Sequence, residues 1–299
     1  MITTEMLQPY VGREQRSADV VDPERMTRLA ALLGRRWNPD DRIPPLGHFL
    51  LFRPDEIQPR IGPDGHPLRD PDGMLPAIDL PRRMWAGSRI RFEQELRPGM
   101  VVTRRSRLAS AVPKSGQSGS MVFCTVVHEI ADETGRLLIT EEQDIVYREA
   151  HAGPQIAVRP SVPPRFEPQE ISSVTADPVM LFRYSALTFN AHRIHYDSEY
   201  AAGDEGYQGL VVHGPLLATL LFDHLRDVSS GRRVLEFSFR GITPAFDGEQ
   251  LVLGSKMEND RALLSVTHSS GLGMTAEALM QAIAEKPALG DAASIAAIR

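Results

Sequence analysis

The sequence has a single cysteine, no long apolar run and no excess of positive charge. Cys124 alone excludes an internal disulfide framework and a cysteine-based zinc cluster, and it is typical of a reducing compartment, so we expect the cytoplasm. No segment is long and apolar enough to cross a bilayer, and the N-terminus lacks the apolar core of a secretory signal. The 33 Lys and Arg are outnumbered by 39 Asp and Glu. The net charge of -6 therefore gives no electrostatic reason to expect nucleic acid or an anionic membrane as a partner.

Several catalytic motifs are also missing. The sequence contains neither a glycine-rich phosphate loop of the dinucleotide or P-loop type nor the HExxH helix of zinc enzymes. The nearest approach to a nucleophile elbow, GQSG at residues 116–119, lacks the GxSxG spacing and predicts a turn. Cys124 alternates with apolar neighbours, which favours a small core residue over a reactive thiolate. Nucleophilic catalysis by serine or cysteine is thus disfavoured.

The composition is that of a soluble globular protein, with 299 residues, 42% of them apolar and 24% charged. Residues 151–176 carry five prolines and no helical or alternating pattern, which predicts an extended linker. We therefore expect an N-terminal domain at 1–150 and a C-terminal domain at 177–299.

The two halves show the same order of predicted elements. Each opens with an Asp-Pro pair, at 22–23 and 177–178, in which Asp caps a helix and Pro takes its first position. A more apolar segment follows, at 44–52 and at 213–225, and we predict a buried helix there. Alternating apolar and polar residues then predict four antiparallel strands in each half. This repeat predicts an α+β pseudo-dimer, in which each sheet wraps a central helix and the two sheets meet edge to edge.

The second half differs by a longer connection between its two helices, and that connection contains LTFNAHRIHYD at residues 187–197. One interpretation is a metal site made by His192 and His195, completed by Asp197 or His213. A second is an acid/base site, and a third is a polar loop that is merely solvated. The histidine spacing is not specific for metal. The concentration of proton-transferring groups between two helices favours the acid/base interpretation.

RYSALTFNAHRIHYD and the later GLVVHGPLLATLL resemble the hydratase and dehydratase branch of the hotdog fold, the MaoC-like family. In that family the pattern runs approximately Y-x-x-L-S-G-D-x-N-P-I-H, followed by a small residue six positions on and by a histidine-glycine pair that begins the central helix. The matching positions here are Tyr184, Leu187, Thr188, His195, Ala201 and the pair His213-Gly214. The variant looks like a subgroup that includes mesaconyl-CoA and itaconyl-CoA hydratases and mitochondrial-type 3-hydroxyacyl-thioester dehydratases. RRMWAGSRIRF and EEQDIVYRE in the first half look like the N-terminal domain of that subgroup.

The sequence departs from the family pattern at two places. Phe189-Asn190 stands where the family has Gly-Asp, and His192-Arg193 stands where it has Asn-Pro. Since the Asp and His of the motif are the family's catalytic pair, the resemblance implies that His195 carries the proton. An amide is no proton carrier, so we expect Asn190 to orient the water. The source of a second proton is left open.

The resemblance also implies roles for neighbouring residues. The N–H of Gly214, at the start of a helix, suits negative charge that develops on a thioester oxygen. Asp197 is expected to orient the imidazole of His195 or to supply the missing acid. The residues expected to bind substrate are Arg183, His192, Arg193, His213, Arg83 and Trp85, with a surface or core position as the alternative for the arginines and for Trp85. The loop at 53–76 has the composition of a mobile cover or of idle surface.

The activity implied by the resemblance is that of a hydro-lyase, which adds or removes water across a 2-enoyl thioester without a metal or redox cofactor. Coenzyme A enters only as part of the substrate, and a short branched or dicarboxylic acyl-CoA, such as mesaconyl-CoA or itaconyl-CoA, is the expected acyl class. A 3-hydroxyacyl-thioester dehydratase of fatty-acid synthesis is one alternative. A non-catalytic acyl-thioester-binding hotdog protein is another, because Asn190 replaces the catalytic Asp. Acyl carrier protein in place of coenzyme A, and a homodimer or higher homo-oligomer, stay open.

Overall fold

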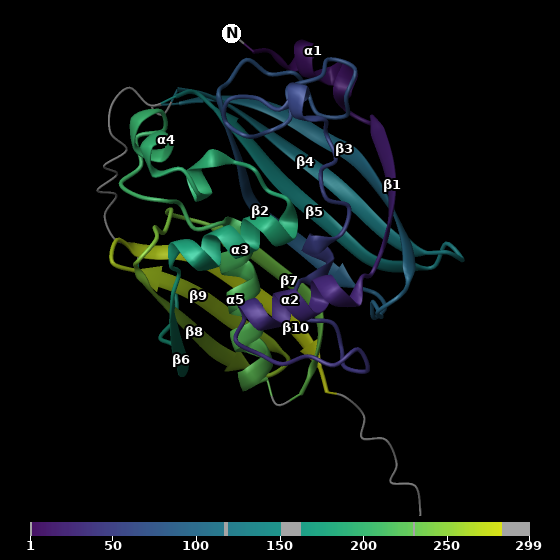
Figure 1. The fold of residues 1–299 in the computed structure, drawn as a ribbon, viewed down its shortest axis with the longest axis vertical. Helices are drawn as coiled ribbons and strands as arrows, with labels where there is room; N and C mark the ends of the chain where they lie inside the picture. Colours follow the sequence, from purple (N-terminus) through teal and green to yellow (C-terminus); the bar gives the residue numbers. More distant parts are fainter. Residues whose placement is uncertain (1, 117–118, 151–162, 230, 283–299) are drawn as a thin grey trace, which may run out of the picture.

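A single antiparallel sheet runs through the computed structural model, which describes residues 2–116, 119–150, 163–229 and 231–282 (Figure 1). The strand order is β1-β3-β4-β5-β2-β7-β10-β9-β8-β6. The strands are β1 Glu14–Val20, β2 Arg82–Phe92, β3 Val101–Gly116, β4 Gly119–Asp132, β5 Leu137–Arg148, β6 Glu170–Thr175, β7 Arg233–Gly241, β8 Gln250–Glu258, β9 Arg261–His268 and β10 Gly271–Gln281. Five strands of each half thus follow in mirrored order about the junction between β2 and β7.

The junction joins the two half-sheets directly. β2 and β7 pair antiparallel, with Gly87 opposite Arg240 and Arg91 opposite Glu236. Glycine is required at position 87, because an added Cβ would lie 2.3 Å from the carbonyl oxygen of Phe239. The predicted edge-to-edge pairing is therefore confirmed, together with the predicted α+β arrangement. All eight predicted strands are present, whereas the two outermost strands, β1 and β6, were not predicted.

Both Asp-Pro pairs begin helices as predicted. Helix α2 spans Pro23–Leu32, and a side-chain oxygen of Asp22 accepts the N–H of Glu24 at 2.8 Å. Helix α3 spans Pro178–Thr188, and Asp177 accepts the N–H of Met180 at 2.7 Å. The two helices pack against each other across the face of the sheet (Figure 1).

Only the second half has a long central helix. Helix α5, Gly214–Val228, buries its leucines against β8, β9 and β10. The buried helix predicted at 44–52 is wrong, since that segment forms only the short 3-10 helix η2, Gly47–Leu50. Leu46 and Phe52, on either side of η2, have left-handed φ values of 50° and 53°, so a regular helix cannot extend past them. The concave face of the first half-sheet is consequently left open.

The remaining elements are short. They are α1 Thr4–Leu7, η1 Gln8–Tyr10, η3 Gln58–Arg60, η4 Arg193–His195 and α4 Ser198–Gly203. Within the expected linker, residues 151–162 lie outside the described residues, as do residues 117–118 of the expected turn. Residues 170–175 form β6, so the second half-sheet begins earlier than the expected boundary at 177, and the division into domains stays a prediction. Among the helices of the described residues, none combines the length and apolarity that a membrane crossing requires.

Candidate active site

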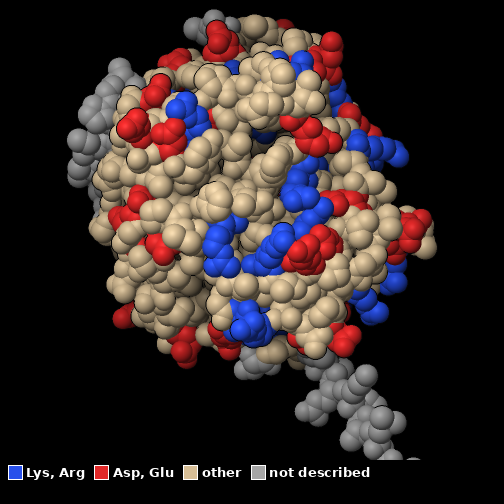
Figure 2. Space-filling model, in the orientation of Figure 1, with Lys and Arg blue, Asp and Glu red and all other residues tan. Residues whose placement is uncertain are grey.

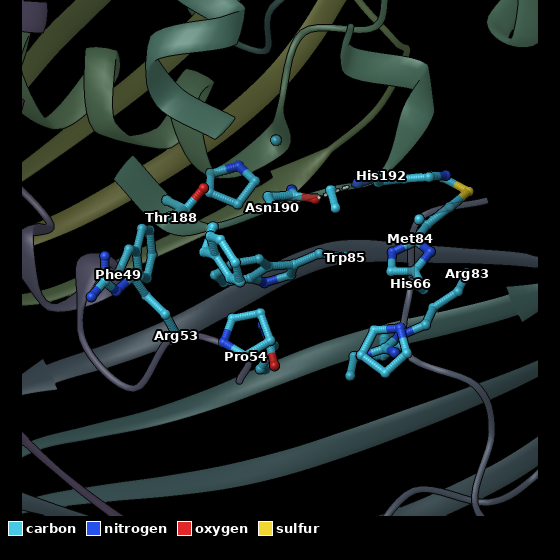
Figure 3. Close-up of a pocket in the computed structure, with 18 of the residues that line it drawn as sticks. Phe49, Arg53, Pro54, His66, Arg83, Met84, Trp85, Thr188, Asn190 and His192 are labelled. Carbon is cyan, nitrogen blue, oxygen red and sulfur yellow. Dashed lines mark hydrogen bonds between the residues drawn. The ribbon is translucent and has the colours of Figure 1, made fainter. Parts of the chain in front are cut away.

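A cavity of about 1600 Å³ lies where the first half lacks its central helix. Its walls are the loop at 53–76, the concave face of β3 to β5, strand β2, the segment 188–196 and the start of α5. Figure 2 shows a hollow near the middle of this face, flanked by basic side chains, and Figure 3 shows part of the lining. The cavity brings the second half's polar segment together with residues of the first half.

His195 ends η4 and is 7% exposed. Its Nδ1 lies 2.7 Å from the carbonyl oxygen of Val211, which can only accept, so Nδ1 carries the proton and Nε2 does not. Burial, together with nearby His192, lowers the pKa of His195 to about 3. The imidazole is therefore neutral near pH 7, and Nε2 can accept a proton inside the cavity.

His213 lies behind His195 and does not line the cavity. The two rings stack with 3.6 Å between centroids and 20° between planes. His213 is fully buried, and its Nε2 is 2.8 Å from the hydroxyl oxygen of Ser185 on α3. Burial lowers the pKa of His213 well below its ordinary value. The structure thus gives His213 a supporting position and not the substrate contact that we expected.

Asn190 lies just after α3, where Phe189 turns the chain with a left-handed φ of 52°. The backbone N–H of Asn190 donates to Ser185, and its side-chain oxygen accepts the N–H of His192 at 3.0 Å (dashed in Figure 3). No described residue accepts from its side-chain NH₂. Asn190 lines the cavity, so this NH₂ group is available to hold a water or a substrate oxygen.

Gly214 is the first residue of α5 and also lines the cavity. Its N–H has no backbone acceptor among the described residues, and the following Pro215 has no N–H at all. A Cβ on Gly214 would lie 3.7 Å from the carbonyl oxygen of Trp85, so this helix start is close to β2. The free N–H and the helix dipole together suit negative charge on a ligand oxygen.

Asp197 does not contact the imidazole that we expected it to orient, because both of its carboxylate oxygens have other partners. One carboxylate oxygen caps α4 by accepting the N–H of Tyr200 at 3.0 Å. The other accepts from Nε and Nη2 of Arg193, at 3.0 and 2.7 Å. Val211, and not Asp197, therefore orients the imidazole of His195. The reason is local: an Asp immediately before a helix is held by the helix N-terminus.

The three expected arginines have different environments. Arg193 is neutralised by Asp197, and its guanidinium lies 4.2 Å from the centre of the Tyr200 ring. Arg183 is exposed on α3 and does not line the cavity. Arg83, at the start of β2, does line the cavity and has no hydrogen-bond or ion-pair partner among the described residues. Arg83 is therefore the expected arginine that can meet an anionic group of a ligand.

Trp85 lines the cavity between the segment 188–196 and the first half-sheet (Figure 3). Its indole N–H donates to the hydroxyl of Ser88 at 2.9 Å, and its ring packs 5.0 Å from that of Phe49 and 6.1 Å from that of Phe239. Trp85 therefore lines the cavity, as expected, and also packs against core aromatic rings, which was the alternative.

Two clusters of polar side chains at the cavity were not predicted as clusters from the sequence. In the first, the hydroxyl of Ser88 donates to Glu141 at 2.7 Å, and Nε2 of His48 lies 3.5 Å from the other Glu141 oxygen. Burial alone would raise the pKa of Glu141, yet its pKa is below the ordinary value because His48, His128 and Ser88 stabilise the anion. In the acidic run EEQD at residues 141–144, Glu141 is the one carboxylate that faces the cavity. The strand alternation could have identified it from the sequence, because it places residue 141 on the inner face of the sheet.

The second cluster consists of Asp64, His66, His192 and Glu205. Nδ1 of His66 lies 3.0 Å from Asp64, the rings of His66 and His192 have centroids 4.2 Å apart, and Nε2 of His192 lies 3.6 Å from Glu205. The loop at 53–76 is fastened at this point, because the N–H of Arg193 donates to the carbonyl of Asp64 at 2.9 Å. The loop thus covers the cavity, while its mobility stays a prediction.

Fold and site together define a double hotdog protein whose cavity holds a neutral imidazole and a helix start with an unpaired N–H among the described residues. A family model described as hydroxyacyl-thioester dehydratase type 2 matches residues 46–247, and the chain belongs to this family. The predicted relationship to MaoC-like hydratases and dehydratases is thereby confirmed.

Individual relatives are consistent with this assignment. The chain is 43% identical over 265 residues to the mesaconyl-C(4)-CoA hydratase of Chloroflexus aurantiacus, covering 88% of this chain and 93% of that protein. It is 28% identical over 227 residues to the mitochondrial hydroxyacyl-thioester dehydratase type 2 of Schizosaccharomyces pombe, covering 68% and 74%. A MaoC-like dehydratase from Phytophthora capsici shares the fold with a TM-score of 0.68 and 15% identity, covering 94% of this chain and 98% of that one.

Proposed function

We propose that this protein hydrates a 2-enoyl-CoA, or dehydrates the corresponding 3-hydroxyacyl-CoA, without a metal or redox cofactor. The observation that carries the proposal is the neutral His195, with Nε2 unprotonated, in one cavity with the unpaired N–H of Gly214. Nε2 of His195 removes a proton from water, and the N–H of Gly214 stabilises charge on the thioester oxygen. The amide of Asn190 holds the water.

We further propose a short acyl group with a second carboxylate, of the mesaconyl or itaconyl kind. Arg83 supplies a cation without a protein partner, and a carboxylate pairs well with a guanidinium. The mesaconyl-C(4)-CoA hydratase at 43% identity supports the same substrate class. The polar side chains on the inner face of β3 to β5, namely Ser106, His128, Glu141 and Gln143, make this surface a poor site for a long alkyl chain.

Coenzyme A carries phosphates, which also need cations. Arg53 lines the cavity, is exposed, and has no partner among the described residues. Figure 3 shows Arg53 and Arg83 at opposite ends of the labelled lining, with Trp85 and Asn190 between them. This arrangement supports a substrate that places its coenzyme A phosphates near Arg53 and its acyl carboxylate near Arg83.

Turnover of a panel of enoyl-CoAs tests the proposal. The wild-type protein should prefer mesaconyl-CoA or itaconyl-CoA over crotonyl-CoA, and H195A should lose roughly 10²- to 10⁴-fold in kcat while it still folds. Full activity of H195A, or no hydration of any enoyl-CoA by the wild type, would show the proposal to be wrong. Activity should also survive exhaustive chelation.

The R83M variant tests the carboxylate site. For the dicarboxylic substrate, kcat/KM should fall roughly 30-fold or more, which corresponds to the loss of about 2 kcal/mol when a buried charge partner is removed. Crotonyl-CoA should be hydrated as before, since it has no carboxylate. R91M is the matched control, because Arg91 is an exposed residue on the same strand that does not line the cavity.

A 3-hydroxyacyl-thioester dehydratase of fatty-acid synthesis is the second candidate, because the matching family model and the S. pombe relative carry that description. A preference for crotonyl-CoA and longer linear acyl chains, unchanged in R83M, would favour it. The buried thiol of Cys124 is consistent with a reducing compartment, so we keep the cytoplasm as the proposed location.

A further inference from the structure

Four ionisable side chains from three separate segments form a row, and three of them, His66, His192 and Glu205, line the cavity. Asp64 and His66 come from the loop at 53–76, His192 comes from the segment after α3, and Glu205 follows α4. The order in space is carboxylate, imidazole, imidazole, carboxylate, with contacts of 3.0, 4.2 and 3.6 Å between neighbours. His192 and Glu205 are 8% and 6% exposed. Such a row is costly to bury unless its charges are compensated.

Charged groups surround the row. Nη1 of Arg82 lies 2.6 Å from Oε1 of Glu205, so this carboxylate forms an ion pair with a guanidinium. Burial opposes the charge on Asp64, but hydrogen bonds from His66 and the attraction of His192 lower the pKa of Asp64 to about 2. Asp64 is therefore an anion at pH 7. The two imidazoles lie between the two carboxylates, and burial, together with His192 and Arg83, lowers the pKa of His66.

His192 lies next to the proposed reaction centre. Its ring centroid is 5.5 Å from that of His195, with the planes almost perpendicular. Its backbone N–H donates a hydrogen bond to the side-chain oxygen of Asn190, and this bond fixes the position of Asn190 relative to His192. Figure 3 shows His192 and His66 facing the same space as Asn190 and Arg83. His192 therefore lies beside the position where an acyl group must present its α- and β-carbons to His195 and Asn190.

We propose that His192 is the second proton carrier of the reaction, because the amide of Asn190 cannot carry a proton. This inference rests on the proposed hydratase function. During hydration, Nε2 of His195 takes a proton from water as the water oxygen bonds to the β-carbon. The electrons of the double bond move onto the thioester oxygen, at the N–H of Gly214. When they return, the α-carbon forms a C–H bond with the proton of the His192 imidazolium, whose N–H bond breaks.

The proton count then closes within the site. His195 has gained one proton and His192 has lost one, so one transfer from His195 to His192, directly or through one water, restores the starting state. His66 and the carboxylates do not touch the reacting atoms in this scheme. Glu205 is a positioning residue, because its carboxylate lies 3.6 Å from Nε2 of His192 and fixes the orientation of the ring.

Kinetics of full-length variants test the inference, with the enoyl-CoA that the wild type hydrates best as the probe. H192Q should lose roughly 10²- to 10⁴-fold in kcat, with KM within about threefold of the wild-type value. E205Q keeps the size of the side chain but removes its charge, so it should also lower kcat and leave KM nearly unchanged. H66N is the matched control, because it disturbs the same row and the same loop, and its kcat should stay within about tenfold of wild type.

Chemical rescue separates proton transfer from a structural role. Truncation in H192A leaves room for one imidazole, so millimolar imidazole should restore part of its kcat, with saturation, and should not raise that of H66A. A kcat of H192Q within tenfold of wild type would overturn the inference. Equal losses in H192Q and H66N without rescue would also overturn it, since His192 would then only fasten the loop. If H195A is inactive while H192Q is active, this inference alone fails; if the wild type hydrates no enoyl-CoA, the proposed function fails as well.

Discussion

The imidazole of His195 stacks on that of His213 with 3.6 Å between the ring centroids. Burial lowers the pKa of both rings, so both are neutral near pH 7. Two imidazolium ions at this distance would also repel each other strongly. The neutral form also explains how His195 can act as a base without a carboxylate partner, because the carbonyl of Val211 holds its tautomer.

The stability of the protein should consequently depend on pH in the acidic range. The pKa of His195 is about 3 in the folded state and that of His213 is also lowered, whereas an unfolded chain has histidine pKa values of about 6.5. The unfolded state thus binds more protons below pH 6.5, so the free energy of unfolding falls as pH decreases from about 6.5 toward 3. Each histidine contributes up to about 1.4 kcal/mol per pH unit.

Urea unfolding at pH 7.5, 6.5 and 5.5 checks this dependence. H195Q removes one of the titrating groups, so its unfolding free energy should change less steeply with pH than that of the wild type. Identical slopes in the two proteins would mean that His195 is not held neutral by the fold.

The parts of the fold that the sequence predicted are those set by local rules. Asp22 and Asp177 cap helices because the cap needs only the next few residues, and alternation identified the inner strands. The prediction of a central helix at 44–52 was wrong, because a short apolar run can be buried in more than one backbone conformation. The exposed edge strand β6 carries little apolar alternation, so its pairing with β8 was invisible in its own sequence.

The candidate site divides in the same way. His195, Asn190 and Gly214 were found together because they lie within one motif and the helix that follows it. Asp64, His66 and Glu205 were missed, since their proximity to His192 depends on how a long loop crosses the cavity and not on spacing in the chain. The orienting partner of His195 was predicted wrongly for a similar reason, because it is the backbone carbonyl of Val211, and every residue carries a carbonyl whatever its side chain.

Removal of the Ser185 hydroxyl should destabilise the His195–His213 stack. Nδ1 of His213 is already buried without a hydrogen-bond partner among the described residues, so S185A leaves both ring nitrogens unpaired within them. An unsatisfied buried polar group costs about 1–3 kcal/mol, which should appear in urea unfolding together with a lower kcat. S172A is the control, because Ser172 also contacts a histidine, His224, but lies at an exposed position where water can replace the hydroxyl. Equal effects of the two substitutions would contradict this account.

Gly65 should be essential for seating the loop at 53–76 on the site. It has a φ of 91°, and an added Cβ would lie 1.7 Å from the carbonyl oxygen of Ala191. G65A must therefore displace the loop from the segment that carries His192, and kcat/KM should fall roughly 10- to 100-fold. G99A introduces the same kind of backbone strain, at a φ of 81°, but its Cβ meets nothing within 4 Å. Its kcat/KM should match the wild-type value, and an equal loss in both variants would show that strain alone matters.

Phe189 occupies a backbone conformation that favours glycine, which the related family has at this position of the motif. Its φ is 52°, its side chain is 61% exposed, and a left-handed conformation costs a side-chain-bearing residue roughly 1–2 kcal/mol. F189G removes this cost but adds entropy to the unfolded chain, so we expect a net stabilisation of about 0.5–1 kcal/mol in urea unfolding. A186G, at an exposed helical position of α3, should instead destabilise by about 1 kcal/mol. Phe189 lines the cavity, so a raised KM in the stabilised F189G variant would indicate that the strained conformation is kept for substrate contact. Destabilisation equal to that of A186G would show that no strain is stored at Phe189.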